Sequence, residues 1–271
     1  MRAMSLLGLL GFICLESLSW GQVPSTPRAE SVFLEDLTWV EVRDAIAAGN
    51  KTIIIPTGGT EQNGPHMVLG KHNFLVKHKA GEIARRLGDA LVAPVLAYVP
   101  EGRIDPPTGH MTFPGTISLP EDVFGQVLEY AARSFRQHGF VDIALVGDSG
   151  GNQDGQKIVA ERLNGQWAGT GVRVHHVTAY YPGRGDDWVV AQGVSAADVG
   201  RHAGIHDTAS LMYLNPSMLR FDRMRPGMAG DGQGHDGDPS KATAEYGRQI
   251  VEMQIQDAVE QIRELRLSSR R

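Results

Sequence analysis

The densest group of potentially catalytic side chains lies between Gly59 and Asn73, in the segment GTEQNGPHMVLGKHN. It contains one carboxylate, Glu61, and two imidazoles, His66 and His72, which are all acceptable ligands for a borderline divalent metal. Its three glycines and one proline let the loop fold tightly, so that its side chains converge. The alternative is a polar loop whose side chains serve turns and caps, and the segment alone leaves both interpretations open.

A second polar segment, Gly147–Asn152, reads GDSGGN. Its first five letters are also the nucleophile signature of chymotrypsin-like proteases, whose fold is all-β and needs a histidine and an aspartate earlier in the chain. Here the segment follows a predicted buried strand, precedes a predicted helix and has no matching histidine segment, so we reject the trypsin-like fold. A serine nucleophile on another fold stays open, with Ser149 attacking and a histidine as its base.

Two further segments combine imidazoles with carboxylates. His202–Thr208 places two histidines and Asp207 within six residues, which is typical of general acid–base groups or of a helix start capped by Asp207 or Thr208. Gly234–Pro239 has the composition of a turn, and Asp238 within it is expected to cap the last helix.

Alternating strands and helices must position these segments. Short apolar or β-branched runs predict strands at 51–55, 91–98, 142–146 and 172–178. Helical spacing predicts helices at 38–49, 74–87, 118–139, 156–163 and 240–265. Capping boxes at Thr38 and Ser118 mark two helix starts, and Gly139 marks a helix end. This order predicts a mostly parallel sheet covered by helices, with ligands beyond the carboxyl ends of the strands, where the first two polar segments lie.

The composition suits one large α/β domain. The chain has 271 residues, of which 41% are hydrophobic and 21% charged, and its net charge is -5. No basic block stands out, so we expect no nucleic-acid partner. The single cysteine, Cys14, lies in the N-terminal apolar run, which excludes disulfides, zinc–thiolate sites and cysteine nucleophiles from a mature chain.

The N-terminus predicts export. Arg2, the apolar run Leu6–Leu15 and the small residues Ser19 and Gly21 fit a secretory signal peptide at 1–21, and the run is too short to span a bilayer. A linker is expected at 22–33 and a single domain at 34–267. We therefore expect a periplasmic or secreted protein with no membrane attachment after cleavage.

Five separated motifs resemble, in order, those of the creatininase family. The family pattern Gly-x-Thr-Glu-Gln-His-Gly-Pro-His-Leu-Pro-Leu matches at Gly59–Gln62, Gly64–His66 and Leu69. The other matches are Phe113–Leu119 after His110, Gly147–Asn152 after His138–Phe140, His202–Thr208, and Gly237–Pro239 followed by Ala242–Glu245 and Gly247. The resemblance runs from about residue 34 to 262.

The resemblance implies a three-layer α/β/α fold and a homo-oligomer such as a hexamer. It also implies hydrolysis of amide C–N bonds of a small-molecule substrate, frequently a cyclic one, by a metal-activated water. Glu61 falls on a metal-binding position, and His202 and Asp207 fall on positions associated with substrate handling and proton transfer. The family covers several ring-opening and peptide-bond chemistries, so the resemblance does not name the substrate.

Three of the family's metal ligands are replaced. Asn63 and Ser149 stand where the family has histidines, and His72 stands where it has an aspartate that bridges two metals. Because a neutral imidazole cannot bridge two cations through one nitrogen, we expect one divalent ion per subunit. Zn, Mn or Fe would be held by Glu61, His72 and Asp148.

The remaining polar side chains of these motifs are assigned to substrate binding: Asn63, His66, His110, Asn152 and His206. Two alternatives to a metal-dependent hydrolase stay open. One is a metal-free hydrolase with Ser149 as its catalytic nucleophile. The other is a ligand-binding protein that keeps the fold after losing the metals.

Overall fold

The computed structural model describes residues 31–268. The predicted signal peptide at 1–21 and most of the predicted linker at 22–33 lie outside the described residues. The end of that linker packs at the edge of the sheet. The carbonyl of Val32 accepts a hydrogen bond of 2.7 Å from the N–H of Val92, and Phe33 forms a parallel bridge with the same residue.

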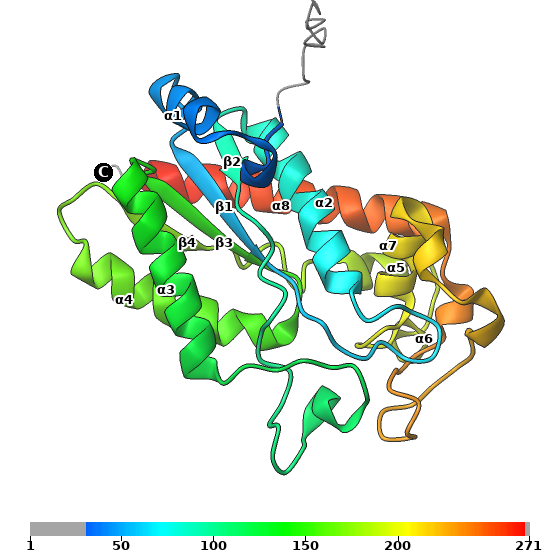
Figure 1. Ribbon diagram of the computed structural model, residues 1–271. Helices are drawn as coiled ribbons and strands as arrows, with labels where there is room; N and C mark the ends of the chain where they lie inside the picture. Colours follow the sequence, from blue (N-terminus) through cyan, green and yellow to red (C-terminus); the bar gives the residue numbers. More distant parts are fainter. Residues whose placement is uncertain (1–30, 269–271) are drawn as a thin grey trace, which may run out of the picture. The chain divides into compact units, whose positions relative to one another are not determined.

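Four strands form one parallel sheet in the order β2–β1–β3–β4 (Figure 1). Their bounds are β1 (Thr52–Thr57), β2 (Ala90–Val92), β3 (Asp142–Gly147) and β4 (Arg173–His176). The parallel sheet is thereby confirmed, and the two central strands β1 and β3 are buried along their whole length. The strand predicted at 91–98 is shorter than expected and ends at Val92, although the N–H groups of Ala93 and Leu96 still donate to the carbonyls of Ile54 and Pro56 at 2.9 Å each.

Helices cover both faces of the sheet, which confirms the three layers (Figure 1). They are α1 (Trp39–Ala47), α2 (Lys71–Leu87), α3 (Glu121–His138), α4 (Gln153–Gln166), α5 (Gly185–Ala191), α6 (Ala196–Val199), α7 (Ile205–Leu214) and α8 (Ala244–Ser268). Side chains alternate along β1, so Ile53 and Ile55 pack with α3 and α4, whereas Ile54 packs with α2 and α8. Within the described residues, no helix has the length and apolar character that crossing a membrane requires.

The predicted helix ends are correct in part. Thr38 caps α1 through the full capping box with Glu41, and Gly139 ends α3 in the left-handed conformation. The prediction for Ser118 is wrong, because α3 begins after Pro120 and the Ser118 hydroxyl instead accepts from the N–H of Glu101 (2.9 Å). Asp238 caps the short 3-10 turn Pro239–Lys241 that precedes α8.

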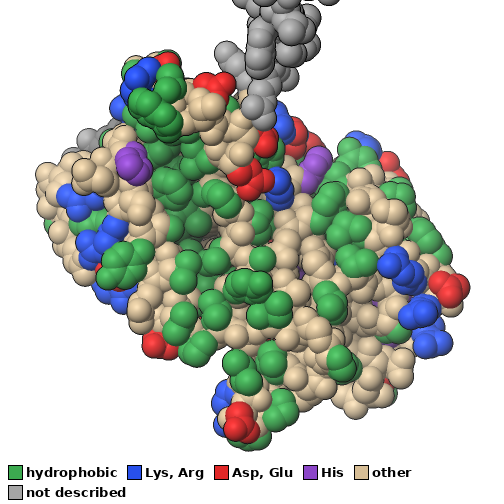
Figure 2. Space-filling view, in the orientation of Figure 1, with side chains coloured by type: hydrophobic (Ala, Val, Ile, Leu, Met, Phe, Trp, Pro, Cys, Tyr) green, Lys and Arg blue, Asp and Glu red, His purple; other side chains and the backbone are tan. Residues whose placement is uncertain are grey.

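The outer face of α3 exposes apolar side chains at helical spacing. Val123, Val127 and Tyr130 are 38%, 40% and 68% exposed. Figure 2 shows hydrophobic side chains distributed over this view of the molecule, while Lys, Arg, Asp and Glu lie mainly toward its edges. The α3 stripe is therefore apolar surface that the monomer leaves uncovered.

Helices α7 and α8 are in close backbone contact at Gly247. A Cβ atom at this position would overlap the carbonyl oxygen of Ala209. The buried Gly125 of α3 is the matched control. There is space for a Cβ atom at this position, because it would contact only Val159, at 3.6 Å. We expect Gly247→Ala to lower the free energy of unfolding by about 2 kcal/mol through overpacking. Gly125→Ala should raise it by about 0.5–1 kcal/mol through helix propensity.

Urea unfolding of the two variants and the parent protein measures both effects. Equal effects of the two substitutions would contradict the close approach of α7 and α8.

Candidate active site

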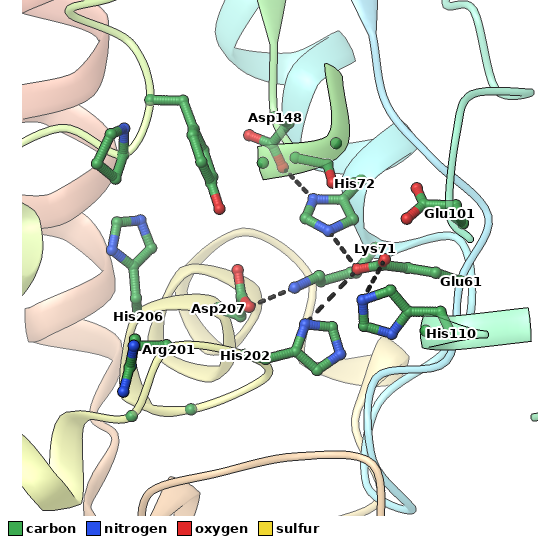
Figure 3. Close-up of a pocket in the computed structure, with 18 of the residues that line it drawn as sticks. Glu61, Lys71, His72, Glu101, His110, Asp148, Arg201, His202, His206 and Asp207 are labelled. Carbon is green, nitrogen blue, oxygen red and sulfur yellow. Dashed lines mark hydrogen bonds and ion pairs between the residues drawn. The ribbon is translucent and has the colours of Figure 1, made fainter. Parts of the chain in front are cut away.

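A pocket of about 730 Å³ lies beyond the carboxyl ends of β1 and β3 (Figure 3). The polar side chains that line it come from separate segments and include Glu61, His72, His110, Asp148, His202 and Asp207. This is the place where ligands bind in open α/β sheets. The first three polar segments of the sequence therefore meet at one cavity.

Contacts within the loop after β1 set the position of Glu61. The side-chain amide of Asn63 donates hydrogen bonds to the carbonyls of Glu61 (2.9 Å) and Val68 (3.2 Å). Gly59 has a φ of +152°, and a Cβ there would overlap the carboxyl group of Glu101. The glycine thus allows Glu101 to approach the loop that carries Glu61.

Asn152 ties the turn after β3 to the end of β1. Its side chain is fully buried, and its amide donates to the carbonyls of Thr57 (3.2 Å) and Gly58 (2.8 Å) and to the Thr57 hydroxyl (2.9 Å). The two loops that present Glu61 and Asp148 are thereby held at a fixed separation.

Glu61, His72 and Asp148 form a buried row. The two ring N–H groups of His72 donate to Glu61 Oε1 and Asp148 Oδ2, each at 2.8 Å. Ionised carboxylates only accept hydrogen bonds, so His72 carries both protons. Burial and the charge of Lys71 lower the pKa of His72, but the two carboxylates raise it by more. The pKa of His72 is therefore above its ordinary value.

The three predicted metal ligands therefore come together, although in a row and not around one point. Both nitrogens of His72 are occupied, which leaves it no lone pair for a metal in this arrangement. Burial raises the pKa of Glu61, but the charge and hydrogen bond of His72 bring it well below its usual range. Glu61 is thus ionised at neutral pH.

Two further buried groups, Tyr180 and Lys79, contact the second oxygen of Asp148. Its Oδ1 accepts a hydrogen bond from the Tyr180 hydroxyl and lies 3.4 Å from the ammonium of Lys79. Lys79 in turn donates to Oε1 of Gln254 on α8 (2.7 Å). Burial raises the pKa of Asp148, but the charge of Lys79 and the hydrogen bond from His72 lower it below the usual value.

Buried Lys71 and half-buried Asp207 form a second ion pair on the pocket wall (Figure 3). The Asp207 carboxylate also accepts from the N–H of Ala203 (3.1 Å), a residue in the left-handed conformation at φ +51°. Burial raises the pKa of Asp207, but the charges of Lys71 and His72 bring it well below its usual range.

Glu101 is a buried carboxyl group beside Glu61 in the same pocket. Burial, its hydrogen bond with Glu61 and the charge of Glu61 raise the pKa of Glu101 to about 10. Glu101 is therefore protonated at neutral pH, and it adds no charge to the site.

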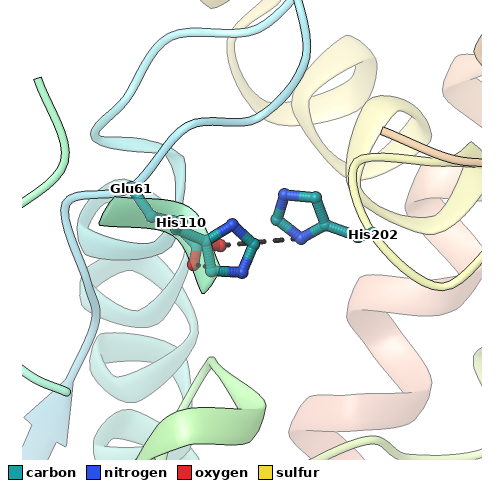
Figure 4. Close-up of side chains that lie close together, drawn as sticks. All are labelled: Glu61, His110 and His202. Carbon is teal, nitrogen blue, oxygen red and sulfur yellow. Dashed lines mark ion pairs between the residues drawn. The ribbon is translucent and has the colours of Figure 1, made fainter. Parts of the chain in front are cut away.

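Glu61, His110 and His202 converge on the pocket wall (Figure 4). Nε2 of His110 is 3.2 Å from Glu61 Oε2, and Nδ1 of His202 is 3.7 Å from Glu61 Oε1. One ligand atom of each residue lies within 4.8 Å of the others. Burial lowers the pKa of both histidines, that of His202 to about 4, so the imidazoles are neutral. Two imidazoles and one carboxylate fit a single borderline divalent ion with positions left open.

Gln62 orients both of these histidines. The Nε2–H of His202 donates to the main-chain carbonyl of Gln62 (2.9 Å), which leaves its Nδ1 lone pair facing Glu61. The side-chain amide of Gln62 lies 2.9 Å from Nδ1 of His110. Metal-bound histidines commonly donate their second N–H in the way that His202 does. The Gln62 amide nitrogen can only donate to His110, so the proton of neutral His110 lies on Nε2, toward Glu61, and a metal would replace it there.

Ser149 lines the pocket without a catalytic base. Within residues 31–268 no hydrogen bond joins its hydroxyl to a histidine, and its carbonyl accepts from the Gln153 amide at 3.0 Å. A serine nucleophile needs such a base within hydrogen-bond reach. The geometry therefore gives no support to Ser149 as a nucleophile.

The residues expected to bind substrate divide into two groups. His110 and His206 line the pocket. Asn63, His66 and Asn152 are fully buried, lie outside the pocket lining and direct hydrogen bonds to the backbone. Side chains that fix a loop are also polar and follow the same strands, so the sequence pattern does not separate them from side chains that bind substrate. The assignment of these three to substrate binding stays a prediction.

The sequence analysis did not single out several charged pocket residues, among them Lys71, Lys79 and Glu101. The sequence pattern could have identified Lys79 as buried, since it stands on the apolar face of α2 between Val76 and Ile83. A charged side chain at such a position needs a buried partner. Nothing in the segment around Glu101 marks it as buried.

Comparison with known proteins places the chain among related hydrolases. A profile of the creatininase family, described as creatinine amidohydrolase, matches residues 35–262. Creatinine amidohydrolase from Pseudomonas putida is 27% identical over 204 residues, which cover 72% of this chain and 76% of the relative. Mycofactocin precursor peptide peptidase from Mycolicibacterium smegmatis is 28% identical over 233 residues, 78% of this chain and 84% of the relative.

The fold is also shared with solved structures. One described as "Creatininase Mn" superposes with a TM-score of 0.71 at 24% identity and covers 87% of this chain and 98% of that chain. This likeness bears on the fold alone, whereas the family profile spans all the polar segments that meet at the pocket. The chain therefore belongs to the creatininase family.

Proposed function

We propose that this chain hydrolyses a C–N bond of a small amide, cyclic amide or short peptide in the pocket, with one divalent metal held by Glu61, His110 and His202. The observation that carries the proposal is the convergence of these three ligand atoms at the wall of a large cavity. Family membership supports it, because the two relatives are named as an amidohydrolase and a peptidase. Zn, Mn and Fe all suit two imidazoles and a carboxylate.

A metal in this position supplies Lewis acidity and an activated water at neutral pH. The chain itself binds and orients the substrate. We assign proton transfer to Asp207 and Lys71, whose ion pair lies on the pocket wall. His206, fixed by Asp186 at 2.7 Å, is assigned to substrate contact. His202, expected to be catalytic, becomes a metal ligand in this arrangement.

The form of the pocket supports a compact, amide-bearing substrate. Six of its lining residues are glycines: Gly102, Gly109, Gly150, Gly151, Gly200 and Gly204. Walls without side chains let the polar groups of a substrate reach backbone N–H and C=O groups directly. This suits a ring amide or a peptide better than a bulky apolar ligand.

Export and self-association remain part of the proposal. The N-terminal pattern of Arg2, an apolar run and small residues supports a periplasmic or secreted protein. The exposed stripe of Val123, Val127 and Tyr130 on α3 supports a homo-oligomer, since contiguous apolar surface commonly marks an interface.

A ligand-binding protein without catalysis is the second candidate. The observation that favours it is the internal charge balance of the pocket. Three ionised carboxylates, Glu61, Asp148 and Asp207, face three buried cations, Lys71, His72 and Lys79. The charges of these six groups thus balance one another before any metal is added.

Metal content separates the two candidates. Protein purified without chelators or a histidine tag should bind about one Zn, Mn or Fe ion per chain. Replacement of a residue that only hydrogen-bonds to a metal ligand weakens metal binding by roughly 10–100-fold. His110→Ala removes a ligand itself, so it should weaken binding by more than this. His138→Ala, at the exposed end of α3, is the matched control and should bind as the parent does. Absence of binding after incubation with each ion would favour the binding protein.

Hydrolysis is tested with a panel of cyclic amides and dipeptides on the metal-loaded protein. We expect ring opening or peptide cleavage that falls at least roughly 100-fold in His110→Ala, because carbonyl polarisation is lost. Ser149→Ala should keep most of the activity. The opposite pattern, with activity lost in Ser149→Ala and insensitive to chelators, would indicate a serine nucleophile.

A further inference from the structure

We propose that His72 and Asp148 are positioning residues that hold the Glu61 carboxylate in the orientation required for metal binding. The inference rests on the proposed function, because it concerns the ligand set Glu61, His110 and His202. In this role His72 and Asp148 act through Glu61 and do not themselves contact the ion.

The two oxygens of Glu61 face different partners. Oε1 accepts the 2.8 Å hydrogen bond from His72, whereas Oε2 faces Nε2 of His110 at 3.2 Å. A carboxylate on a three-bond side chain would otherwise rotate freely about its last torsion. The contact with His72 fixes that torsion, so Oε2 stays directed toward His110, while Oε1 lies between His72 and, at 3.7 Å, Nδ1 of His202.

His72 cannot fix Glu61 unless its own ring is fixed. Its second N–H donates to Asp148 at 2.8 Å, and its side chain is only 5% exposed. Asp148 comes from the end of β3 and His72 from the start of α2, so the row spans two rigid elements. Sites supported in this way keep their geometry better than sites on loops alone.

The far end of the row is anchored in the core. Tyr180 and Lys79 contact the remaining oxygen of Asp148, and Lys79 is bound to Gln254 of α8. All four side chains are 4% exposed or less. Partners of metal ligands that lie outside the ligand set commonly change metal affinity by about 10–100-fold when they are replaced.

The test is the Kd of Co²⁺ and Zn²⁺ for Asp148→Asn, measured by competition with a chromophoric chelator, together with the visible spectrum of the Co²⁺ protein. Asparagine keeps the size of the side chain but removes its charge. We expect binding about 10–100-fold weaker than in the parent, at unchanged stoichiometry. The Co²⁺ bands should shift, because Glu61 changes its orientation.

Asp142→Asn is the matched control. Asp142 accepts a 2.8 Å hydrogen bond from buried His175 and lies 3.4 Å from a cation, Arg266, so it repeats the histidine and cation contacts of Asp148 away from the pocket. This variant should lose comparable stability and keep the Kd and the spectrum of the parent. Tyr180→Phe, which removes one hydrogen bond to Asp148, serves as the milder variant if Asp148→Asn does not fold.

The outcomes separate the two proposals. If the parent binds metal and Asp148→Asn has the same Kd and spectrum, the positioning role alone is overturned. Where Asp148→Asn does not fold, the same result in Tyr180→Phe overturns it. Equal weakening in Asp142→Asn also overturns it, because the effect would then be one of general stability. No binding by the parent protein overturns the proposed function and the positioning role together.

Discussion

Burial of three ionised carboxylates at one edge of the sheet is the constraint on which the rest of the site depends. A buried charge without a partner costs several kcal/mol, so Glu61, Asp148 and Asp207 each require a cation at short range. A single helix, α2, supplies all of these cations: Lys71, His72 and Lys79. The position of α2 against β1 and α8 is therefore fixed by charge as well as by its apolar face.

Much of the fold followed from local patterns. The run at 51–55 and the capping box at Thr38 specify a strand and a helix start within a few residues, and the alternation of such elements predicts a parallel, helix-covered sheet. The same argument placed the polar segments after β1 and β3 at one edge. Local patterns failed at Ser118, whose hydroxyl is used by a segment earlier in the chain.

The composition of the site was harder to predict than its place. Glu61 was recognisable from its motif, but its partners His110 and His202 are brought to it by the tertiary fold. Spacing along the chain carries no information about which nitrogen of a histidine is already occupied. The row through His72 could therefore be predicted as a cluster of residues, but not as a chain of hydrogen bonds with both ring protons in use.

The linked charges of the pocket also limit how its sequence can change over generations. Replacement of Lys79 alone would leave Asp148 short of a counter-charge, and replacement of Asp148 alone would strand both Lys79 and His72, at a cost of about 3–5 kcal/mol for each buried pair broken. Residues joined in this way do not contribute additively. Substitutions at these positions are therefore expected to occur together. A homologue that differs at one residue of the row should also differ at the residues in contact with it.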